Sequence, residues 1–230
     1  MVNQKSAFGK ALLLTLIVFV IGFAIGYTIE NNRTTSVEIA LLNSEISLAD
    51  EQIKLSTIQQ LNLTCNESKD STFEFADRIY QEALKLEEYD SSGKLMNTLT
   101  TFHRRYDLLR ALLWTEGSKI RQQCPNQFHT IAYFYDYKTE NLKKDAQQKM
   151  LDRLLLDFKY NYPDQVLLIP IAANLDIESV NLVMKKYDIQ ECPALVIDET
   201  LVIKEAPTFD ELKNTVFRDK LTNSTNITSQ

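Results

Sequence analysis

The residues best suited to chemistry in this chain of 230 residues are its three cysteines and two histidines, which are widely spaced. Cys192 stands directly before Pro193. A thiol becomes a nucleophile when a neighbouring cation or a helix N-terminus lowers its pKa, and the sequence places no obvious cation close to Cys192. The pattern therefore favours Cys192 as a small packing residue, with a reactive thiol as the alternative.

The remaining candidates predict neither a metal site nor an active site. His103 and His129 are too few and too far apart for a metal-ligand motif, and His103 stands beside Arg104 and Arg105, which predicts a solvated helix face. The sequence contains no glycine-rich phosphate loop, nucleophile elbow or paired-carboxylate motif. We therefore expect no catalytic residue, no metal and no cofactor. The net charge of -6 argues against nucleic acid as a partner.

An uncharged apolar segment from Ala11 to Ile29 follows Lys5 and Lys10. Its length suits a helix that crosses a bilayer core of roughly 30 Å. Because the basic residues precede it, we expect residues 1–30 to form a cytoplasmic tip and a single membrane-spanning signal-anchor helix, with the rest of the chain outside. A cleaved signal peptide ending near residues 24–26 is the alternative.

Gly22 and Gly26 form a G-x-x-x-G pattern within the apolar segment. This spacing lets two helix backbones approach closely in lipid, so it is compatible with a structural homodimer in the cell envelope. Glycine is common in membrane helices, and the pair is equally compatible with a helix that has no partner.

Residues 31–125 predict a helical stalk or hairpin region of three helices joined by short turns. The first would cover about residues 36–63, the second would begin at the capping box Ser71-Thr-Phe-Glu74, and the third would run from about Lys94 to Gln123. Apolar residues in the first helix have a heptad-like spacing that ends early. They indicate either a coiled-coil stalk that pairs two chains or an amphipathic helix packed on its own domain.

Cys65 and Cys124 would follow the carboxyl ends of the first and third helices. These two helices would run in the same direction, so both thiols are expected at the same end of the bundle. Outside a membrane, a structural disulfide between them is plausible and would close a long loop. Two unrelated thiols are the alternative.

Five N-x-[ST] tripeptides fall in segments that we expect to be linkers, a loop or the tail. This distribution is compatible with a glycosylated external protein, although such tripeptides also arise by chance. The candidate acceptors are Asn32, Asn62, Asn66, Asn223 and Asn226.

Residues 126–219 predict a separate α/β domain with the element order βαβαββα, followed by a disordered polar tail at 220–230. The expected strands are aromatic or β-branched runs with buried character. They cover residues 129–135, 166–172, 194–197 and 201–203, and the expected helices cover residues 138–160, 177–187 and a final segment opened by a capping box at Thr208.

The run Tyr187-x-Ile189-x-x-x-Pro193-x-Leu195, preceded by Asn174-Leu-Asp176, resembles the second half of a thioredoxin domain. The resemblance covers about residues 128–218 and rests on element order plus this single motif. It implies a thioredoxin-like fold in which the bond before Pro193 is cis. The helical region stands where the family has its first strand and helix.

The chain departs from thioredoxins at the residues that carry their chemistry. In the family, the strand that matches residues 129–135 leads into a Cys-x-x-Cys at the start of the next helix, where the helix N-terminus lowers the thiol pKa. The matching positions here are Thr139 to Leu142, and Tyr133 replaces the family's buried acid. Dithiol exchange needs a thiolate and a resolving thiol, and this motif supplies neither.

The resemblance then implies a surface that binds extended peptides, formed by Tyr137, Thr139, Cys192 and Pro193. We expect a redox-inactive protein- or peptide-binding module of the cell envelope. Two alternatives remain open at this point. One is a thiol-disulfide oxidoreductase or isomerase that uses Cys192 or the Cys65 and Cys124 pair, and the other is the structural homodimer.

Overall fold

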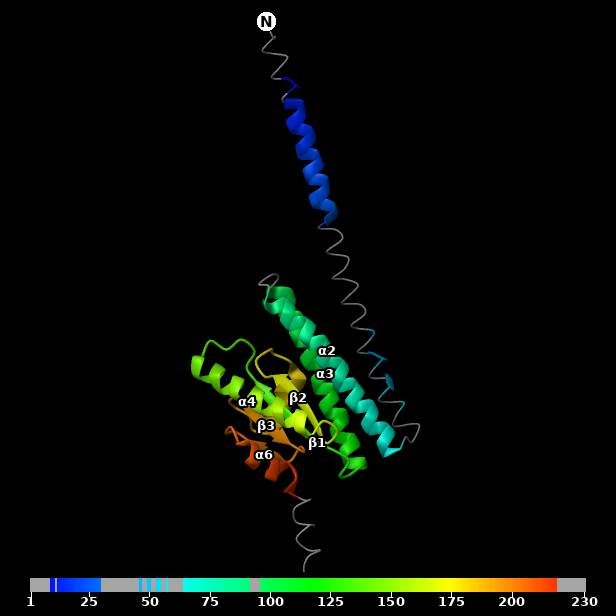
Figure 1. Ribbon diagram of the computed structural model, residues 1–230, viewed down its shortest axis with the longest axis vertical. Coiled ribbons are helices and arrows are strands. Elements are labelled where there is room, and N and C mark those ends of the chain that lie inside the picture. The colour runs from blue at the N-terminus through cyan, green and yellow to red at the C-terminus, as the bar shows by residue number, and fades with distance from the viewer. Residues whose placement is uncertain are drawn as a thin grey trace, which may run out of the picture. The chain divides into compact units, whose positions relative to one another are not determined.

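The computed structural model describes residues 9–10, 12–29, 46, 49–50, 53–54, 57, 64–91 and 96–218. The chain divides into two compact units, Met1–Thr57 and Ile58–Gln230 (Figure 1). The predicted helix at 36–63 with its heptads, the tail at 220–230, and four of the candidate acceptors (Asn32, Asn62, Asn223 and Asn226) lie outside the described residues, apart from isolated helical positions between residues 46 and 57.

In the first unit, a helix covers Leu12–Ile29 with a mean hydropathy of 2.5, and its side chains are exposed. Its length and composition are those of a helix that could cross a membrane. A signal sequence near an N-terminus has the same properties. A Cβ added at Gly22 or Gly26 would meet nothing within 4 Å, so both glycines face open space.

The second unit begins with two long helices, α2 (Cys65–Ser91) and α3 (Met96–Gln123). A capping box opens α2, because Thr64 N donates to the Glu67 carboxylate (2.9 Å) and Glu67 N donates to Thr64 Oγ1 (3.4 Å). The predicted start at Ser71 was wrong, since Ser71 and Glu74 lie inside α2. The same four-residue pattern occurs twice, and the earlier copy forms the cap.

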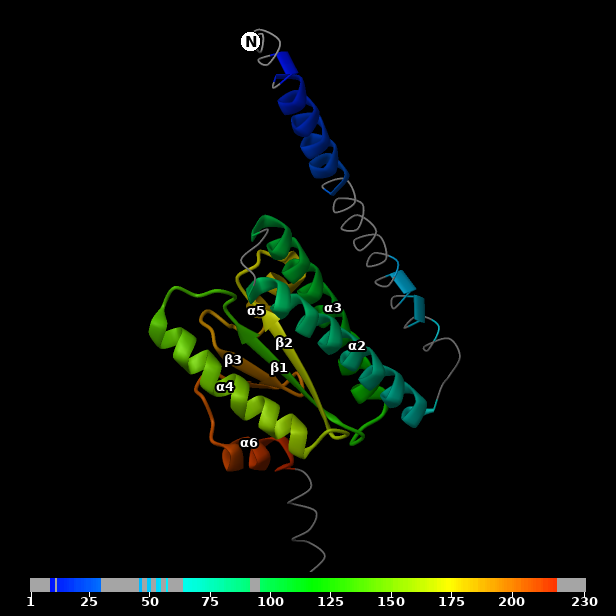
Figure 2. The same ribbon diagram turned by 45° about the horizontal axis from the view of Figure 1, so that its top comes forward.

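A disulfide joins Cys65 and Cys124, with their Cα atoms 5.6 Å apart. The pairing agrees with the expectation, but the reason for it differs. Cys65 is the first residue of α2, and Cys124 directly follows α3. Because α2 and α3 form an antiparallel hairpin, the start of one lies beside the end of the other (Figure 2).

The sheet has four strands in the order β2-β1-β3-β4. β1 (His129–Tyr135) pairs in parallel with β2 (Val166–Ala172), and β3 (Ala194–Ile197) pairs antiparallel with both β1 and β4 (Leu201–Ile203). The predicted strand bounds and the order βαβαββα are confirmed. The chain is thus a mixed α/β protein.

Helices cover both faces of the sheet (Figure 2). On one face lie α4 (Leu142–Asn161) and α6 (Phe209–Val216), and on the other lies α3, with α2 and α5 (Glu178–Lys186) packed beside it. The two helical layers therefore enclose a single sheet. The compact unit includes α2 and α3, so the chain divides after Thr57 and not near residue 125.

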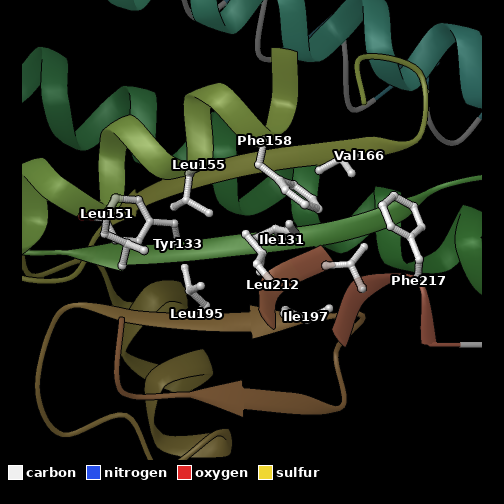
Figure 3. Close-up of a cluster of buried hydrophobic side chains, with 11 residues drawn as sticks. Ile131, Tyr133, Leu151, Leu155, Phe158, Val166, Leu195, Ile197, Leu212 and Phe217 are labelled. Atoms are coloured by element: carbon white, nitrogen blue, oxygen red, sulfur yellow. The ribbon is translucent and has the colours of Figure 1, made fainter. Parts of the chain in front are cut away.

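The core between the sheet and α4 follows from alternation along β1. Ile131 and Tyr133 point to the same face because strand side chains alternate. Figure 3 shows Leu151, Leu155 and Phe158 of α4 packed against them. Met150, the neighbour of Leu151 in the sequence, is 57% exposed, because it lies about 100° around the helix from Leu151.

On the opposite face of the sheet, α3 approaches closely. Trp114 packs edge-on against Phe134 of β1, with ring centroids 5.8 Å apart. A Cβ at Gly117 would lie 2.8 Å from Leu167 Cδ2 in β2. Glycine at this position therefore lets the helix lie near the strands.

Candidate functional site

The candidate site lies at the edge of the sheet where β1 and β2 end and β3 begins. Phe134 in β1 is opposite Ala194 in β3. The register places Cys192 and Pro193, just before β3, next to the segment that leaves β1 at Asp136. The Cys192–Pro193 peptide bond is cis, as the resemblance implied.

Cys192 is 7% exposed and is the free cysteine of the described chain. Burial raises the pKa of its thiol to about 12, and the charge of the neighbouring Asp136 carboxylate, which accepts a hydrogen bond from the thiol, adds to the increase. The nearby Lys144 ammonium opposes this effect. At neutral pH the side chain is therefore a protonated thiol, which is a poor nucleophile.

Asp136 and Lys144 form the polar side of this site. Lys144 Nζ lies 2.6 Å from Asp136 Oδ2. The pKa of Lys144 is raised by its hydrogen bond to Asp136. The side-chain amide of Gln148 fixes the backbone of Asp136: its Oε1 accepts from Asp136 N (2.8 Å) and its Nε2 donates to Asp136 O (3.0 Å). Contacts from Lys144 and Gln148, one turn apart on α4, thus fix Asp136 beside Cys192.

α4 begins at Leu142, four residues later than the predicted start at Lys138. Asn141 is the N-cap, and its side chain accepts hydrogen bonds from Lys143 N and Lys144 N. The cap and first helical residues are therefore Asn141 to Lys144, and Thr139 lies before the cap. None of these positions holds a cysteine, so the shift leaves the absence of a dithiol unchanged.

Tyr137 is held on the side of β2 and α3. Its backbone exchanges two hydrogen bonds with the Asn174 amide, at 2.7 and 2.9 Å, and its ring lies 4.1 Å from the His103 ring. Thr139 Oγ1 accepts a bond from Asn141 N at 3.3 Å, so it joins the cap of α4. His103 is half-buried by this contact, and its expected place on a solvated face was wrong.

The sequence did not identify Asp136 and Lys144 as site residues. They lie about 50 positions before Cys192, and only the pairing of β3 with β1 brings them together. The signal for the α4 cap was available, since asparagine before a lysine-rich amphipathic run is a common N-cap pattern.

The cysteines do not form one redox site. Cys124 precedes the start of β1, whereas Cys192 lies beside its end, and a seven-residue strand separates them by roughly 20 Å. Across the described residues, no group of three or more His, Cys, Asp or Glu side chains is arranged to hold a metal ion.

Asn66 is the one candidate acceptor within the described residues. It was expected in a loop, but it lies in the first turn of α2 with an exposed side chain. Ser68 of the same tripeptide is buried. The tripeptide therefore has an accessible asparagine and an enclosed hydroxyl in the folded chain.

Comparison of the chain with protein-family models, with curated proteins and with solved structures finds no match.

Proposed function

We propose that residues 128–218 form a thioredoxin-like domain that lacks dithiol chemistry and binds an extended protein or peptide segment outside a membrane. The strand order β2-β1-β3-β4, in which β3 runs against the other three strands, supports this fold. The position of Pro193 directly before β3 supports it as well.

The observation that carries the proposal is the environment of Cys192. Its thiol is buried and protonated, and it donates a hydrogen bond to Asp136. The first turn of α4 beside it supplies no second thiol. In the proposed fold, the place where a thioredoxin does its chemistry therefore holds no nucleophile. The role that we propose for this place is to bind a polypeptide.

Features suited to contact lie next to this thiol and at the start of α4. Leu142, in the first turn of α4, is 84% exposed, while Thr139 and Pro193 are half-buried. An exposed leucine in this position offers an apolar contact to a bound segment, and backbone groups beside β3 offer hydrogen bonds of the kind used in strand addition.

The apolar helix Leu12–Ile29 would anchor this domain. Lys5 and Lys10 precede it, and the positive-inside tendency would keep them in the cytoplasm. The domain would then face the outside of the membrane, where the Cys65–Cys124 disulfide is stable.

The test uses the full chain purified in detergent and a fluorescent, reduced and carboxymethylated polypeptide that stays extended. We expect saturable binding by fluorescence anisotropy, and at least tenfold weaker binding for the double variant Thr139→Arg, Leu142→Asp. Leu182→Asp, which changes an exposed leucine on α5, is the matched control and should bind normally.

Two results would contradict the proposal. One is equal loss of binding in the control variant, which would indicate a nonspecific apolar effect. The other is sustained turnover in an insulin-reduction assay, which would show that the domain does perform dithiol chemistry.

A further inference from the structure

The turn between β3 and β4 has an unusual backbone. Asp198 (φ 48°) and Glu199 (φ 55°) both occupy the left-handed region, and Thr200 N donates to Ile197 O (3.1 Å) to close the turn. Left-handed residues in a hairpin turn are normally glycine, asparagine or aspartate, because a Cβ makes this conformation costly for other residues. Asp198 fits this preference but Glu199 does not, so other contacts must hold Glu199 in this conformation.

The Glu199 carboxylate receives hydrogen bonds from two different elements. Oε1 accepts from the Trp114 indole N–H of α3 (3.0 Å) and from the Thr130 hydroxyl of β1. Oε2 accepts two bonds from the Arg121 guanidinium of α3, at 3.0 and 2.7 Å. The Glu199 backbone carbonyl also accepts a bond from the Tyr187 hydroxyl (3.2 Å).

Asp198 is fixed in the same way. Its Oδ1 accepts from Thr130 N at 2.9 Å, and its Oδ2 lies 2.7 Å from His129 Nδ1. Arg121 Nη2 donates to the Asp198 backbone carbonyl at 2.7 Å. Arg121 therefore contacts both left-handed residues at once, from a helix on the face of the sheet.

β4 depends on this turn more than the other strands do. It has three residues, it pairs with β3 alone, and Leu201 at its start is exposed while β3 is buried throughout. A short edge strand has little apolar contact to keep it paired.

We propose that Arg121 and Trp114 of α3, through Glu199 and Asp198, form a latch that keeps the β3–β4 turn left-handed, so that edge strand β4 stays ordered only while α3 is in place. Displacement of α3 would release the turn and uncover the edge of β3. This device is independent of any ligand at the Cys192 edge.

The experiment measures hydrogen exchange of the full chain in detergent on peptides that cover residues 200–204. For Arg121→Met we expect exchange in this segment at least tenfold faster than in the wild type, with exchange in β1 unchanged within twofold. Lys119→Met is the matched control on α3, since Lys119 pairs with Glu116 within the helix, and it should leave residues 200–204 unchanged.

A glycine substitution at Glu199 distinguishes two explanations: that Arg121 holds the turn left-handed, or that it only packs against the turn. If Arg121 acts by holding Glu199 left-handed, then Arg121→Met combined with Glu199→Gly should restore protection of residues 200–204 to within threefold of the wild type, because glycine needs no holding. Failure of this rescue would overturn the proposal. So would wild-type exchange rates in Arg121→Met.

Trp114 provides a second readout because it is the chain's single tryptophan. Its emission should move to longer wavelength in Arg121→Met, as its carboxylate partner is freed. Should Arg121→Met fail to fold, Arg121→Lys keeps the charge but loses the paired bonds, and it should increase exchange at residues 200–204 at least threefold. Unchanged exchange in that folded variant would also overturn the latch.

Discussion

Burial, followed by the Asp136 carboxylate, keeps the Cys192 thiol protonated with a pKa of about 12. Alkylation requires the thiolate. We therefore predict that iodoacetamide labels Cys192 at pH 7.5 roughly a thousandfold more slowly than a free thiol of pKa about 8.5. The disulfide protects the other two cysteines, so mass spectrometry of the native chain measures this one site.

Asp136→Ala tests whether the Asp136 carboxylate contributes to the raised pKa of the Cys192 thiol. Removing the neighbouring negative charge and its hydrogen bond leaves Lys144 to stabilise the thiolate, so labelling of Cys192 should become about tenfold faster. Asp145→Ala, which removes an exposed carboxylate paired with Lys149, should leave the rate unchanged. Equal acceleration in both variants would mean that the local charge at Asp136 is not responsible.

The buried carboxyl of Asp107 in α3 should make the stability of the folded chain depend on pH. It is fully buried, its Oδ1 accepts bonds from Ala172 N (3.1 Å) and Arg110 (3.2 Å), and its Oδ2 has no partner. Burial raises the pKa of this carboxyl above its ordinary 3.8, against the opposing charge of Arg110. The folded chain therefore keeps this proton at pH values where the unfolded chain has lost it.

The sign of the effect follows from that difference. With a raised folded pKa, the contribution of Asp107 to stability is fully present below pH 3.8 and is lost as the pH rises through the folded pKa. Asp107→Asn has no carboxyl to titrate at this position. The unfolding free energy of the wild type should therefore fall relative to that of the variant as the pH rises from 4 to 7. Urea unfolding at several pH values measures it, and a constant difference would contradict the assignment.

The N-terminus of α4 has the geometry to activate a thiol although it holds none. The Asn141 side chain accepts bonds from Lys143 N (3.1 Å) and Lys144 N (3.2 Å). In Asn141→Cys, a thiolate would face the same two donors and the positive end of the helix dipole. We predict a thiol pKa below 7.5, read from the pH dependence of its alkylation.

Thr139→Cys is the control for this element. It lies before the cap, outside the helix, and should titrate near the ordinary value of about 8.5. The loss of the asparagine cap should cost Asn141→Cys about 1 kcal/mol of stability. If both new thiols have the same pKa, the N-terminus of α4 does not activate a thiol.

The strands could be predicted more accurately than the helices for a physical reason. Val166 to Ala172 is an unbroken apolar run, because a strand covered by helices on both faces needs apolar side chains in both directions. The start of α2 was missed because buried Ser68 and Thr72 hide its apolar period, and because two capping boxes compete within ten residues.

Sequence reasoning also found only part of the polar structure. Cys192 and Pro193 stand in a local motif that can be seen in the sequence. Lys144 of α4 lies near them only because β3 pairs with β1. Acidic residues such as Asp198 and Glu199 are mostly exposed in proteins. Here their carboxylates are 20% and 11% exposed and lie against Arg121, which is more than 70 residues away in the sequence, and a sequence pattern cannot supply such a partner.

At the scale of the second unit, the helical pair and the sheet should unfold together. Trp114 packs on Phe134 and Tyr187, and Arg121 is bonded to the β3–β4 turn. These contacts tie α3 to β1, to Tyr187 and to the β3–β4 turn. We therefore expect chemical unfolding followed by Trp114 fluorescence to coincide with unfolding followed by circular dichroism at 222 nm, apart from the contribution of the apolar N-terminal helix.

Removing the disulfide tests whether the second unit unfolds as one, because the cross-link acts mainly by constraining the unfolded chain. Cys65 and Cys124 are 59 residues apart, and cross-linking a loop of this length stabilises the folded state by about 4 kcal/mol in the chain-entropy model. Cys65→Ser combined with Cys124→Ser should lower the unfolding free energy by about that amount in both signals. If the circular dichroism transition moved and the Trp114 transition stayed in place, α2 would unfold separately, and the single cooperative unit would be contradicted.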